Sequence, residues 1–394
     1  MEGTRRERGL ARLAELGDEP GGDAFIERMG NPMGEWLVDW VFGDVHARPG
    51  LSARERELII VAVLSAIGSS DPQVAAHIRA LRAIDVPWEE IEETPPDRAV
   101  RRDPARDQRA QGAADGAGAM RALRYTIGGD ARLGRLDDLT VVDAGPAGPF
   151  GLVPSPETWA ALEAADGDRR SLGDVTVLYP TEPRKIMAIG LNYRDHAEES
   201  ELDIPPVPVV FAKWPSSLIS PEEPIVVPRE ESRPDYEGEV AVILGRDVYR
   251  ADADQARAAV GGITIVNDVS GRRAQLETPL RQFTLGKSFD TFTPMGPFVQ
   301  NADGVDLERI AIETRVSGEV MQSSSTANLI FSVVEIIEYL SKGMTLYAGD
   351  VIATGTPGGV GDSRDPRRYL REGDEVEISV AGVGTLRNPV MLEA

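Results

Sequence analysis

Cysteine is absent from this sequence, and histidine is scarce. None of the 394 residues is cysteine, and the 3 histidines are His46, His77 and His196. The absence of thiols excludes disulfides, thiolate zinc sites, iron–sulfur clusters and cysteine nucleophiles. Imidazole chemistry near neutral pH therefore has to use one of these three side chains.

Basic residues are also in short supply. Lys and Arg number 42 against 65 Asp and Glu, which gives a net charge of −23. This charge repels phosphate backbones and anionic lipid headgroups, so we expect neither a nucleic-acid partner nor a membrane partner. The first ten residues, MEGTRRERGL, contain no apolar segment of the signal-peptide kind, which predicts a cytoplasmic protein.

The apolar run at residues 58–67 (LIIVAVLSAI) is too short to cross a bilayer, which needs roughly 20 residues. The run predicts a buried helix, and Ser52 with Glu55 has the spacing of a capping box at its start. A second helix is expected at residues 73–83. Residues 1–94 are therefore predicted to form a small all-α module.

A segment with few large apolar side chains follows this module. Residues 95–119 contain Val100 as the one large aliphatic side chain, among Ala, Gly, Pro, Arg, Asp and Gln. Burial of such residues cannot offset the entropy of ordering them, so we predict a flexible linker between two domains. A chain of 394 residues is also long for one core.

Beyond the linker, short apolar runs separated by Gly and Pro predict strands. A helix is expected at residues 332–340, so the chain as a whole belongs to the α+β class. The predicted strands are residues 185–190, 209–213, 240–244, 263–266, 310–316, 351–354 and 375–380.

Three carboxylates form a candidate metal site. If a strand begins at Glu237, then Glu237 and Glu239 share one face, and their charges need a cation or a shared proton. Asp268 ends the apolar segment GGITIVND. Oxygen ligands without cysteine point to Mg²⁺ or Mn²⁺ rather than Zn²⁺. The alternative is a solvated strand face with Asp268 in a turn.

Six segments, in this order, resemble the fumarylacetoacetate hydrolase family: KIMAIGLNYRDHAEE, FAKWPSSLISP, DYEGEVAVILG, GKSFDTFTPMGP, DVIATGTPGGVG and GVGTLRNPV. The resemblance implies a mixed β-roll over residues 181–394, preceded by a leader subdomain at residues 120–180. It also implies that Glu237, Glu239 and Asp268 bind the metal. We expect a homodimer through this domain.

His196 and Glu199 lie three residues apart in NYRDHAEES, so a short helix would bring them together. The carboxylate could then orient the imidazole and raise its basicity. A surface histidine beside acidic residues is the alternative. The family resemblance implies that the two residues form a dyad that activates water, on a segment that closes over bound ligand.

Two lysines and a short helical segment are candidate substrate contacts. Lys213 and Lys287 could bind a carboxylate or an enolate oxygen, and the alternative is that they extend along the surface. The resemblance places Lys287 in the catalytic set and Lys213 in the substrate pocket. It also implies that Arg272 and Gln275 line the pocket, whereas Arg273 departs from the acidic residue usual there.

Thr356 lies in the glycine-rich segment TGTPGGVG. The backbone amides of such a turn could face a carboxylate, and the resemblance places Thr356 among the substrate contacts. A plain turn is the alternative interpretation of the glycines.

The N-terminal module resembles the carboxymuconolactone decarboxylase family over residues 24–93, particularly in RPGLSARERELI. It lacks the cysteine pair of some relatives and the helices that normally follow. His77 corresponds to a functional histidine of that family. We nevertheless favour an oligomerisation or vestigial role for the module, which would permit an oligomer larger than a dimer.

The main prediction is a metal-dependent hydrolase that cleaves a C–C bond in a 2-oxo acid of the acylpyruvate or fumarylpyruvate type. A metal-stabilised enolate and water activated by His196 and Glu199 would carry the reaction. The alternative is an isomerase or decarboxylase of 2-oxo diacids, of the 2-hydroxyhepta-2,4-diene-1,7-dioate isomerase or oxaloacetate decarboxylase type. A non-catalytic assembly scaffold is a third hypothesis, which would require a defective metal site.

Overall fold

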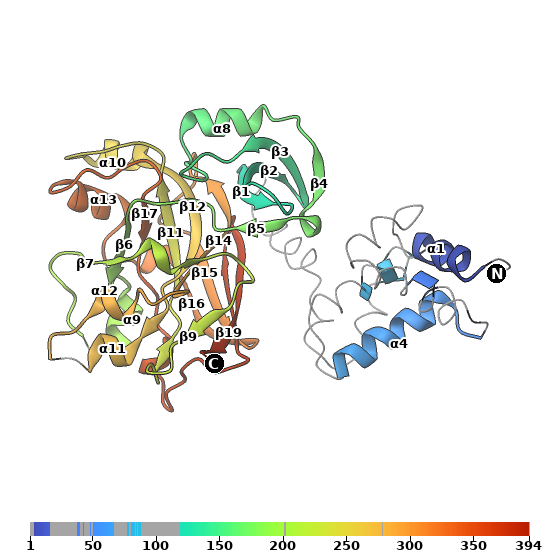
Figure 1. Ribbon diagram of the computed structural model, residues 1–394. Helices are drawn as coiled ribbons and strands as arrows, with labels where there is room; N and C mark the ends of the chain where they lie inside the picture. Colours follow the sequence, from blue (N-terminus) through green and yellow to red (C-terminus); the bar gives the residue numbers. More distant parts are fainter. Residues whose placement is uncertain are drawn as a thin grey trace. The chain divides into compact units, whose positions relative to one another are not determined.

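The computed structural model divides the chain into two compact units, Met1–Asp107 and Gln108–Ala394, which are described separately (Figure 1). The residues that it describes are 4–15, 38–39, 42, 48, 50–66, 77–78, 80–82, 84, 86–87, 119–200, 202–277 and 279–393. The predicted linker lies outside the described residues except for its last residue. Among the described residues, no helix is long and apolar enough to span a membrane.

Most of the described residues of the first unit are helical. It contains α1 (Arg5–Glu15) and α4 (Ala53–Ala66). The predicted capping box is confirmed, because the Ser52 amide donates to Glu55 Oε2 at 2.7 Å and the Glu55 amide donates to Ser52 Oγ at 3.2 Å. Helix α4 is only partly buried, since Val61 is fully covered whereas Ile59 is 50% exposed.

The predicted helix at residues 73–83 is seen only in part. The described residues 77–78 and 80–82 are helical, and the others of that range lie outside the described residues. Leu81 and Val86 pack with Val61 in a small apolar cluster.

The second unit contains a 12-stranded mixed sheet with the main strand order β4-β3-β2-β1-β14-β12-β11-β17-β6-β7, in which β5 also pairs with β1 and β8 with β14. Most pairs are antiparallel, but β17 pairs with β6, and β14 with β8, in parallel. The strands are β1 (Arg121–Thr126), β2 (Arg132–Asp137), β3 (Thr140–Pro146), β4 (Arg169–Ser171), β5 (Thr176–Leu178), β6 (Ile186–Gly190), β7 (Val209–Lys213), β8 (Leu218–Ile219), β11 (Gly238–Leu244), β12 (Val260–Asn267), β14 (Thr293–Asn301) and β17 (Val351–Ala353).

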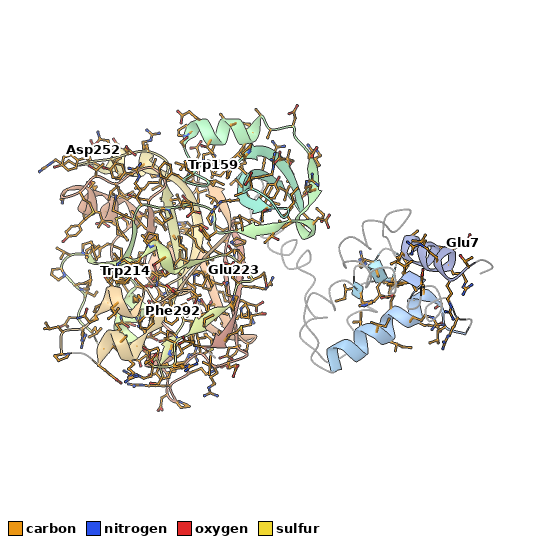
Figure 2. The ribbon with its side chains drawn as sticks, viewed as in Figure 1. Glu7, Trp159, Trp214, Glu223, Asp252 and Phe292 are labelled. Carbon is orange, nitrogen blue, oxygen red and sulfur yellow. The ribbon has the colours of Figure 1, made fainter. Side chains whose placement is uncertain are left out.

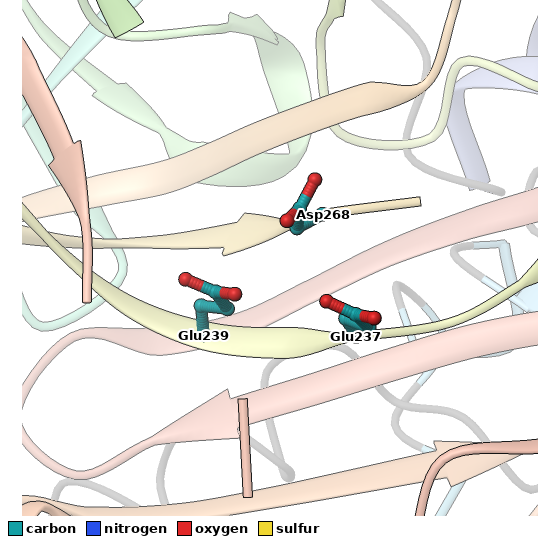
Figure 3. Close-up of side chains that lie close together, drawn as sticks. All are labelled: Glu237, Glu239 and Asp268. Atoms are coloured by element: carbon teal, nitrogen blue, oxygen red, sulfur yellow. The ribbon is translucent and has the colours of Figure 1, made fainter. Parts of the chain in front are cut away.

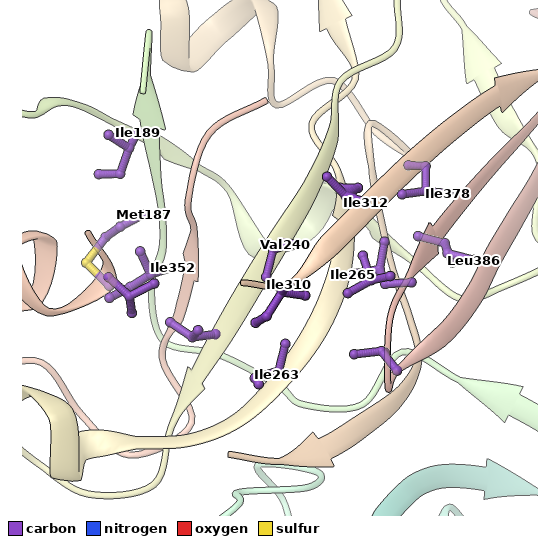
Figure 4. Packing of buried hydrophobic residues seen from close by; sticks show 14 of the residues in the cluster. Met187, Ile189, Val240, Ile263, Ile265, Ile310, Ile312, Ile352, Ile378 and Leu386 are labelled. Atoms are coloured by element: carbon purple, nitrogen blue, oxygen red, sulfur yellow. The ribbon is translucent and has the colours of Figure 1, made fainter. Parts of the chain in front are cut away.

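A five-stranded sheet of order β16-β15-β18-β19-β9 packs against the long sheet. Its strands are β9 (Ile225–Val227), β15 (Ala311–Val316), β16 (Glu319–Ser325), β18 (Glu375–Val380) and β19 (Gly384–Leu392), and a separate pair joins β10 (Pro234–Asp235) to β13 (Ser270–Gly271). Alternate residues of the two sheets meet in the core, as Val240 and Ile265 of the long sheet and Ile312 and Ile378 of the short one illustrate (Figure 4). This strand-rich architecture confirms the predicted α+β class and the mixed β-roll.

The second unit also contains short helices. They are α8 (Pro156–Glu163), α9 (Arg194–Glu199), α10 (Ala253–Ala259), α11 (Arg272–Leu276), α12 (Phe283–Gly286) and α13 (Val333–Ser341). The helix expected at residues 332–340 corresponds to α13, whose start is fixed by a capping box between Ser332 and Glu335. A similar box between Asp252 (Figure 2) and Gln255 starts α10.

The leader at residues 120–180 is joined to the rest of the long sheet by backbone pairing. Strand β1 pairs with β14, so β1 to β3 extend the long sheet. Trp159 of α8, labelled in Figure 2, donates from Nε1 to the Gly261 carbonyl at 2.9 Å. These contacts fix the leader against β12 and β14.

Candidate active site

The strand register brings the three predicted metal ligands together. Strands β11 and β12 are antiparallel, with Gly238 opposite Asn267, and the Asp268 amide donates to the Glu237 carbonyl at 2.8 Å. Glu237 directly precedes β11, which begins at Gly238, two residues before the predicted strand at residues 240–244. Its side chain and that of Glu239 lie near Asp268 (Figure 3), and possible ligand atoms of the three residues lie within 4.8 Å of one another.

All three carboxylates are buried, which excludes the solvated-face interpretation. The exposed fractions of Glu237, Glu239 and Asp268 are 5%, 1% and 0%. The set offers only oxygen ligands, and it therefore fits a hard divalent cation such as Mg²⁺ or Mn²⁺. We refer to these three residues as the acidic triad.

Two lysines reach the triad from inside the protein. Lys287 Nζ lies 2.6 Å from both Glu237 Oε2 and Asp268 Oδ2. Lys213 Nζ lies 2.7 Å from Asp268 Oδ1. Both lysines are buried, so the interpretation as surface side chains is wrong.

Among the residues that the structure describes, Glu239 forms no ion pair of the kind that Glu237 forms with Lys287 and Arg272. One of its oxygens, Oε2, accepts a hydrogen bond from the Gly355 amide at 2.7 Å. Burial, together with the charges of Asp268 and Glu237, raises its pKa well above the ordinary value. Burial also acts on Glu237, but Lys287 and Arg272 outweigh it and lower its pKa to about 2. Glu239 thus needs a proton or an additional cation, which is the requirement that a metal would meet.

Arg272 links the triad to a buried carboxylate that sequence reasoning missed. Its Nε and Nη2 donate to Asp235 Oδ2 at 2.9 and 2.8 Å, and Nη2 lies 2.7 Å from Glu237 Oε1. Its Nη1 donates to Gln275 Oε1 at 3.1 Å. Asp235 also accepts from the Gly361 amide at 2.8 Å, so it fixes the guanidinium beside the triad. The signal for Asp235 was its place in DYEGE, two residues before Glu237.

Arg273 does not share this environment. It is half exposed, its Nε lies 3.5 Å from Glu277 Oε2, and its Nη1 donates to the Glu230 carbonyl. The departure from the family pattern at Arg273 therefore lies among surface contacts and not among the contacts described for the triad.

His196 and Glu199 form the predicted pair on α9. Their Nδ1 and Oε1 atoms lie 2.7 Å apart, and Glu199 Oε2 accepts from the Gly359 amide at 2.6 Å. Both side chains are partly covered, with 14% and 24% exposed. The charge of His196 is also among the causes that lower the pKa of Glu237.

We call residues Gly355 to Gly359 the glycine turn. As predicted, its backbone amides face carboxylates, and these are side chains of the protein itself. Its amides donate to Glu239 from Gly355, to Asp195 from Gly358 and to Glu199 from Gly359. A side chain at Gly359 would collide with the Met321 carbonyl, and its φ of +106° also favours glycine. The glycine turn therefore connects the triad with α9.

Thr356 lies in the glycine turn, and two hydrogen bonds hold its hydroxyl group. Its hydroxyl donates to the Gly238 carbonyl at 3.1 Å and accepts from Gln322 Nε2 at 2.7 Å. Gln322 Oε1 in turn accepts from the Gly238 amide at 2.9 Å. Sequence reasoning missed Gln322, because a glutamine in an ordinary strand carries no motif.

The first unit contains its own acid–histidine pair. His77 Nδ1 lies 2.6 Å from Glu57 Oε2, and the Glu57 side chain is fully buried. This contact occurs in packed and in catalytic histidines alike, so the non-catalytic role of the module stays a prediction. Sequence reasoning did not identify Glu57, because it lies 20 residues from His77.

Comparisons with known proteins assign both parts of the chain. Residues 185–391 match the fumarylacetoacetate (FAA) hydrolase C-terminal family, and residues 32–116 match the carboxymuconolactone decarboxylase family. Oxaloacetate tautomerase YisK of Bacillus subtilis (strain 168) is 47% identical over 216 residues, which cover 54% of this chain and 71% of that protein.

Solved structures agree in fold. The 2-hydroxyhepta-2,4-diene-1,7-dioate isomerase of Mycobacterium marinum is 32% identical with a TM-score of 0.58, covering 70% of this chain and 99% of that chain. The fumarylacetoacetate hydrolase of Exiguobacterium antarcticum is 36% identical with a TM-score of 0.59, covering 70% and 100%.

The predicted hydrolase activity gains no specific support from these proteins. The identity to the oxaloacetate tautomerase, 47%, is higher than the identity to the fumarylacetoacetate hydrolase, 36%. The isomerase or decarboxylase alternative agrees with them better. The chain belongs to the fumarylacetoacetate hydrolase family of enzymes, and a carboxymuconolactone decarboxylase family segment precedes that domain.

Proposed function

We propose that this protein is a divalent-metal-dependent enzyme that interconverts the enol and keto forms of oxaloacetate or a closely related 2-oxo dicarboxylate. The observation that carries the proposal is the buried acidic triad, with Lys287 and Arg272 at hydrogen-bond distance from it. The identity of 47% to an oxaloacetate tautomerase supports the choice of substrate.

Charge balance favours a cation and an anionic substrate together. Glu237, Glu239, Asp268 and Asp235 bring four acidic groups, whereas Lys213, Lys287 and Arg272 bring three basic ones. A divalent ion held by the triad would give the cluster a positive charge, which a dicarboxylate would offset. Such an ion would supply Lewis-acid stabilisation of an enolate oxygen.

Lys287 is the residue best placed to bind the substrate. Its ammonium group contacts both Glu237 and Asp268, so it could donate to an oxygen of a substrate bound at the triad. Burial opposes its charge, but Asp268 and Glu237 outweigh burial and raise its pKa, so it remains a cationic donor. Donation to the oxygen on which negative charge develops lowers the barrier to tautomerisation.

His196 would move the proton. Glu199 holds its Nδ1, which leaves Nε2 to take the enol proton or to return one to carbon. In the direction from enol to keto, the enol O–H bond breaks and a C3–H bond forms, so the reaction consumes no water. Hydrolysis would instead require a water molecule to attack a distal carbonyl group.

A proton shift along a longer conjugated diacid is the second candidate. It uses the same enolate chemistry, and the 32% identity to a 2-hydroxyhepta-2,4-diene-1,7-dioate isomerase favours it. The two candidates differ in the size of the substrate, so direct comparison of rates separates them.

The test is an assay of the purified full chain with Mg²⁺. We expect it to accelerate the loss of enol absorbance when enol oxaloacetic acid is added to buffer, with kcat/KM at least tenfold above that for the dienedioate. A higher kcat/KM for the dienedioate would select the second candidate. Faster C–C cleavage of acetylpyruvate would restore the hydrolase prediction, and loss of CO₂ from oxaloacetate faster than enol loss would indicate a decarboxylase. No turnover of any of them, with no metal bound, would favour the scaffold hypothesis.

A further inference from the structure

Helix α9 carries three acidic side chains, Asp195, Glu198 and Glu199. Among the interactions described, Asp195 makes no contact with the metal ligands. Asp195 Oδ1 accepts from the His196 amide at 2.8 Å and from the Gly358 amide at 3.3 Å. Its other oxygen, Oδ2, accepts from Ser324 Oγ on β16 at 2.7 Å. One carboxylate thus joins α9 to the glycine turn and to the short sheet.

These contacts matter because α9 is too short to hold its own orientation. It contains 6 residues, and a helix of this length is unstable without tertiary contacts. Its N-terminal residue has no side-chain cap, since Tyr193 at the N-cap position makes no such hydrogen bond. The position of His196 therefore depends on what anchors the helix from outside.

The anchors lie at both ends of α9. Asp195 binds Gly358 and Ser324 at the first turn, and Glu199 binds Gly359 at the last. The same glycine turn holds Glu239 through the Gly355 amide. A displacement of α9 at its first turn would move His196 relative to the triad, whereas Glu239 would keep its own contact.

We propose that Asp195 is a positioning residue that holds α9 so that His196 faces the acidic triad. The role of the histidine rests on the proposed function, but the anchoring of α9 does not. Asp195 acts through His196 and Glu199, so its loss should impair turnover without weakening metal binding. Ser324 supports the same anchor from β16, where its Oγ also accepts from Asn328 Nδ2 at 2.9 Å.

Four variants of the full-length enzyme test this role. Asp195→Ala removes all three contacts, Asp195→Asn keeps an oxygen that can accept from both amides, and Ser324→Ala removes one contact. Glu198→Gln is the matched control, because Glu198 lies on the same helix with its side chain in solvent. The measurements are kcat and KM for enol oxaloacetate, Mg²⁺ affinity by calorimetry, and hydrogen–deuterium exchange of the α9 amides.

For Asp195→Ala we expect kcat to fall about 10- to 100-fold, the range seen when groups that orient catalytic residues are removed. KM and Mg²⁺ affinity should change less than about threefold, exchange in α9 should rise about tenfold or more, and Asp195→Asn should recover most of the activity. Ser324→Ala should lie between the wild type and Asp195→Ala. In a His196→Ala background, Asp195→Ala should lower kcat no further.

Several results would overturn the proposal. These are an equal loss of kcat from Asp195→Ala in the His196→Ala background, a parallel loss of Mg²⁺ affinity, or effects no larger than those of Glu198→Gln. If the wild type does not act on oxaloacetate, the proposed function fails. Hydrogen–deuterium exchange of the α9 amides then tests by itself whether Asp195 anchors the helix. Unchanged α9 exchange in Asp195→Ala would then show that Asp195 does not hold the helix.

Discussion

Two acid–histidine pairs in this chain have nearly the same hydrogen-bond length and very different surroundings. His77 and Glu57 lie 2.6 Å apart in the first unit, and His196 and Glu199 lie 2.7 Å apart in the second. Among the described residues, the one group of three possible metal ligands is the acidic triad, which lies in the same unit as His196. The short contact alone does not define a catalytic site, because packing and catalysis both use it. What separates the two cases is this group of possible metal ligands, in the same unit as His196 and Glu199.

Loss of a triad carboxylate should have the largest effect. Glu239→Gln removes a charged ligand while preserving shape, so we expect Mg²⁺ binding to be lost and turnover of enol oxaloacetate to fall about 10³-fold, equivalent to several kcal/mol of transition-state stabilisation. Calorimetry and initial rates measure both effects. Glu372→Gln, at an exposed turn, is the control and should match the wild type. Normal metal affinity in Glu239→Gln would show that the metal lies elsewhere.

The next prediction compares the two histidines directly. His196→Ala should lower kcat about 10²- to 10⁴-fold, the usual contribution of a positioned acid or base, whereas His77→Ala should stay within about twofold. Both variants are assayed with Mg²⁺ on the same substrate. If His77→Ala lost as much activity as His196→Ala, the first unit would have a catalytic role and the distinction between the pairs would be wrong.

The raised pKa of Glu239 predicts how pH and metal affect stability. In the metal-free protein, Glu239 loses its proton near the ordinary Glu pKa of 4.5 when the chain is unfolded. In the folded state it keeps this proton to higher pH. The contribution of Glu239 to the free energy of unfolding is therefore present below pH 4.5 and is lost as pH rises through the higher folded pKa. Glu237 acts in the opposite sense, and its contribution is lost as pH falls from 4.5 toward about 2.

Chemical denaturation across pH, with and without Mg²⁺, measures this effect. Mg²⁺ should add about 2.7 kcal/mol at 100 times its Kd and should release a proton on binding. Glu239→Gln should remove both the decline above pH 4.5 and the proton release. An unchanged decline in that variant would assign it to another group.

Removal of the first unit should have the smallest effect. We expect residues 120–394 to retain kcat within about twofold, because every described contact of the triad and of α9 lies within the second unit. Rates of the shortened and full chains at equal Mg²⁺ measure this, and light scattering of both tests the predicted homodimer. A loss of kcat with metal affinity intact would show that the first unit takes part in the reaction.

Much of the fold could be predicted because the apolar residues that mark a buried strand are consecutive or nearly consecutive in the sequence. Strands β11 and β12 were evident as apolar runs, although their ends were misjudged by one to three residues. Strand β14 was missed because Gly296 and Pro297 interrupt its pattern, although the strand is buried along most of its length. Strands β1 and β2 were missed because arginines interrupt their apolar residues, and β4 and β5 were missed because each has only 3 residues.

The site was predictable only where residues are close in sequence or belong to a family motif. The triad and the pair on α9 meet those conditions. The contacts of Asp235 with Arg272 and of Gln322 with Gly238 span 37 and 84 residues, so only the folded chain brings them together. Both lysines were predicted as substrate contacts, and the structure adds that they lie inside the protein against Asp268.

Proton exchange at C3 of oxaloacetate tests the central claim most directly. In D₂O with Mg²⁺, nuclear magnetic resonance should show that the wild type accelerates deuterium incorporation at C3 without consuming the substrate, and that Glu239→Gln and His196→Ala do not. Exchange at the uncatalysed rate in the wild type, or equal acceleration by Glu239→Gln, would contradict a metal-centred proton transfer at the acidic triad.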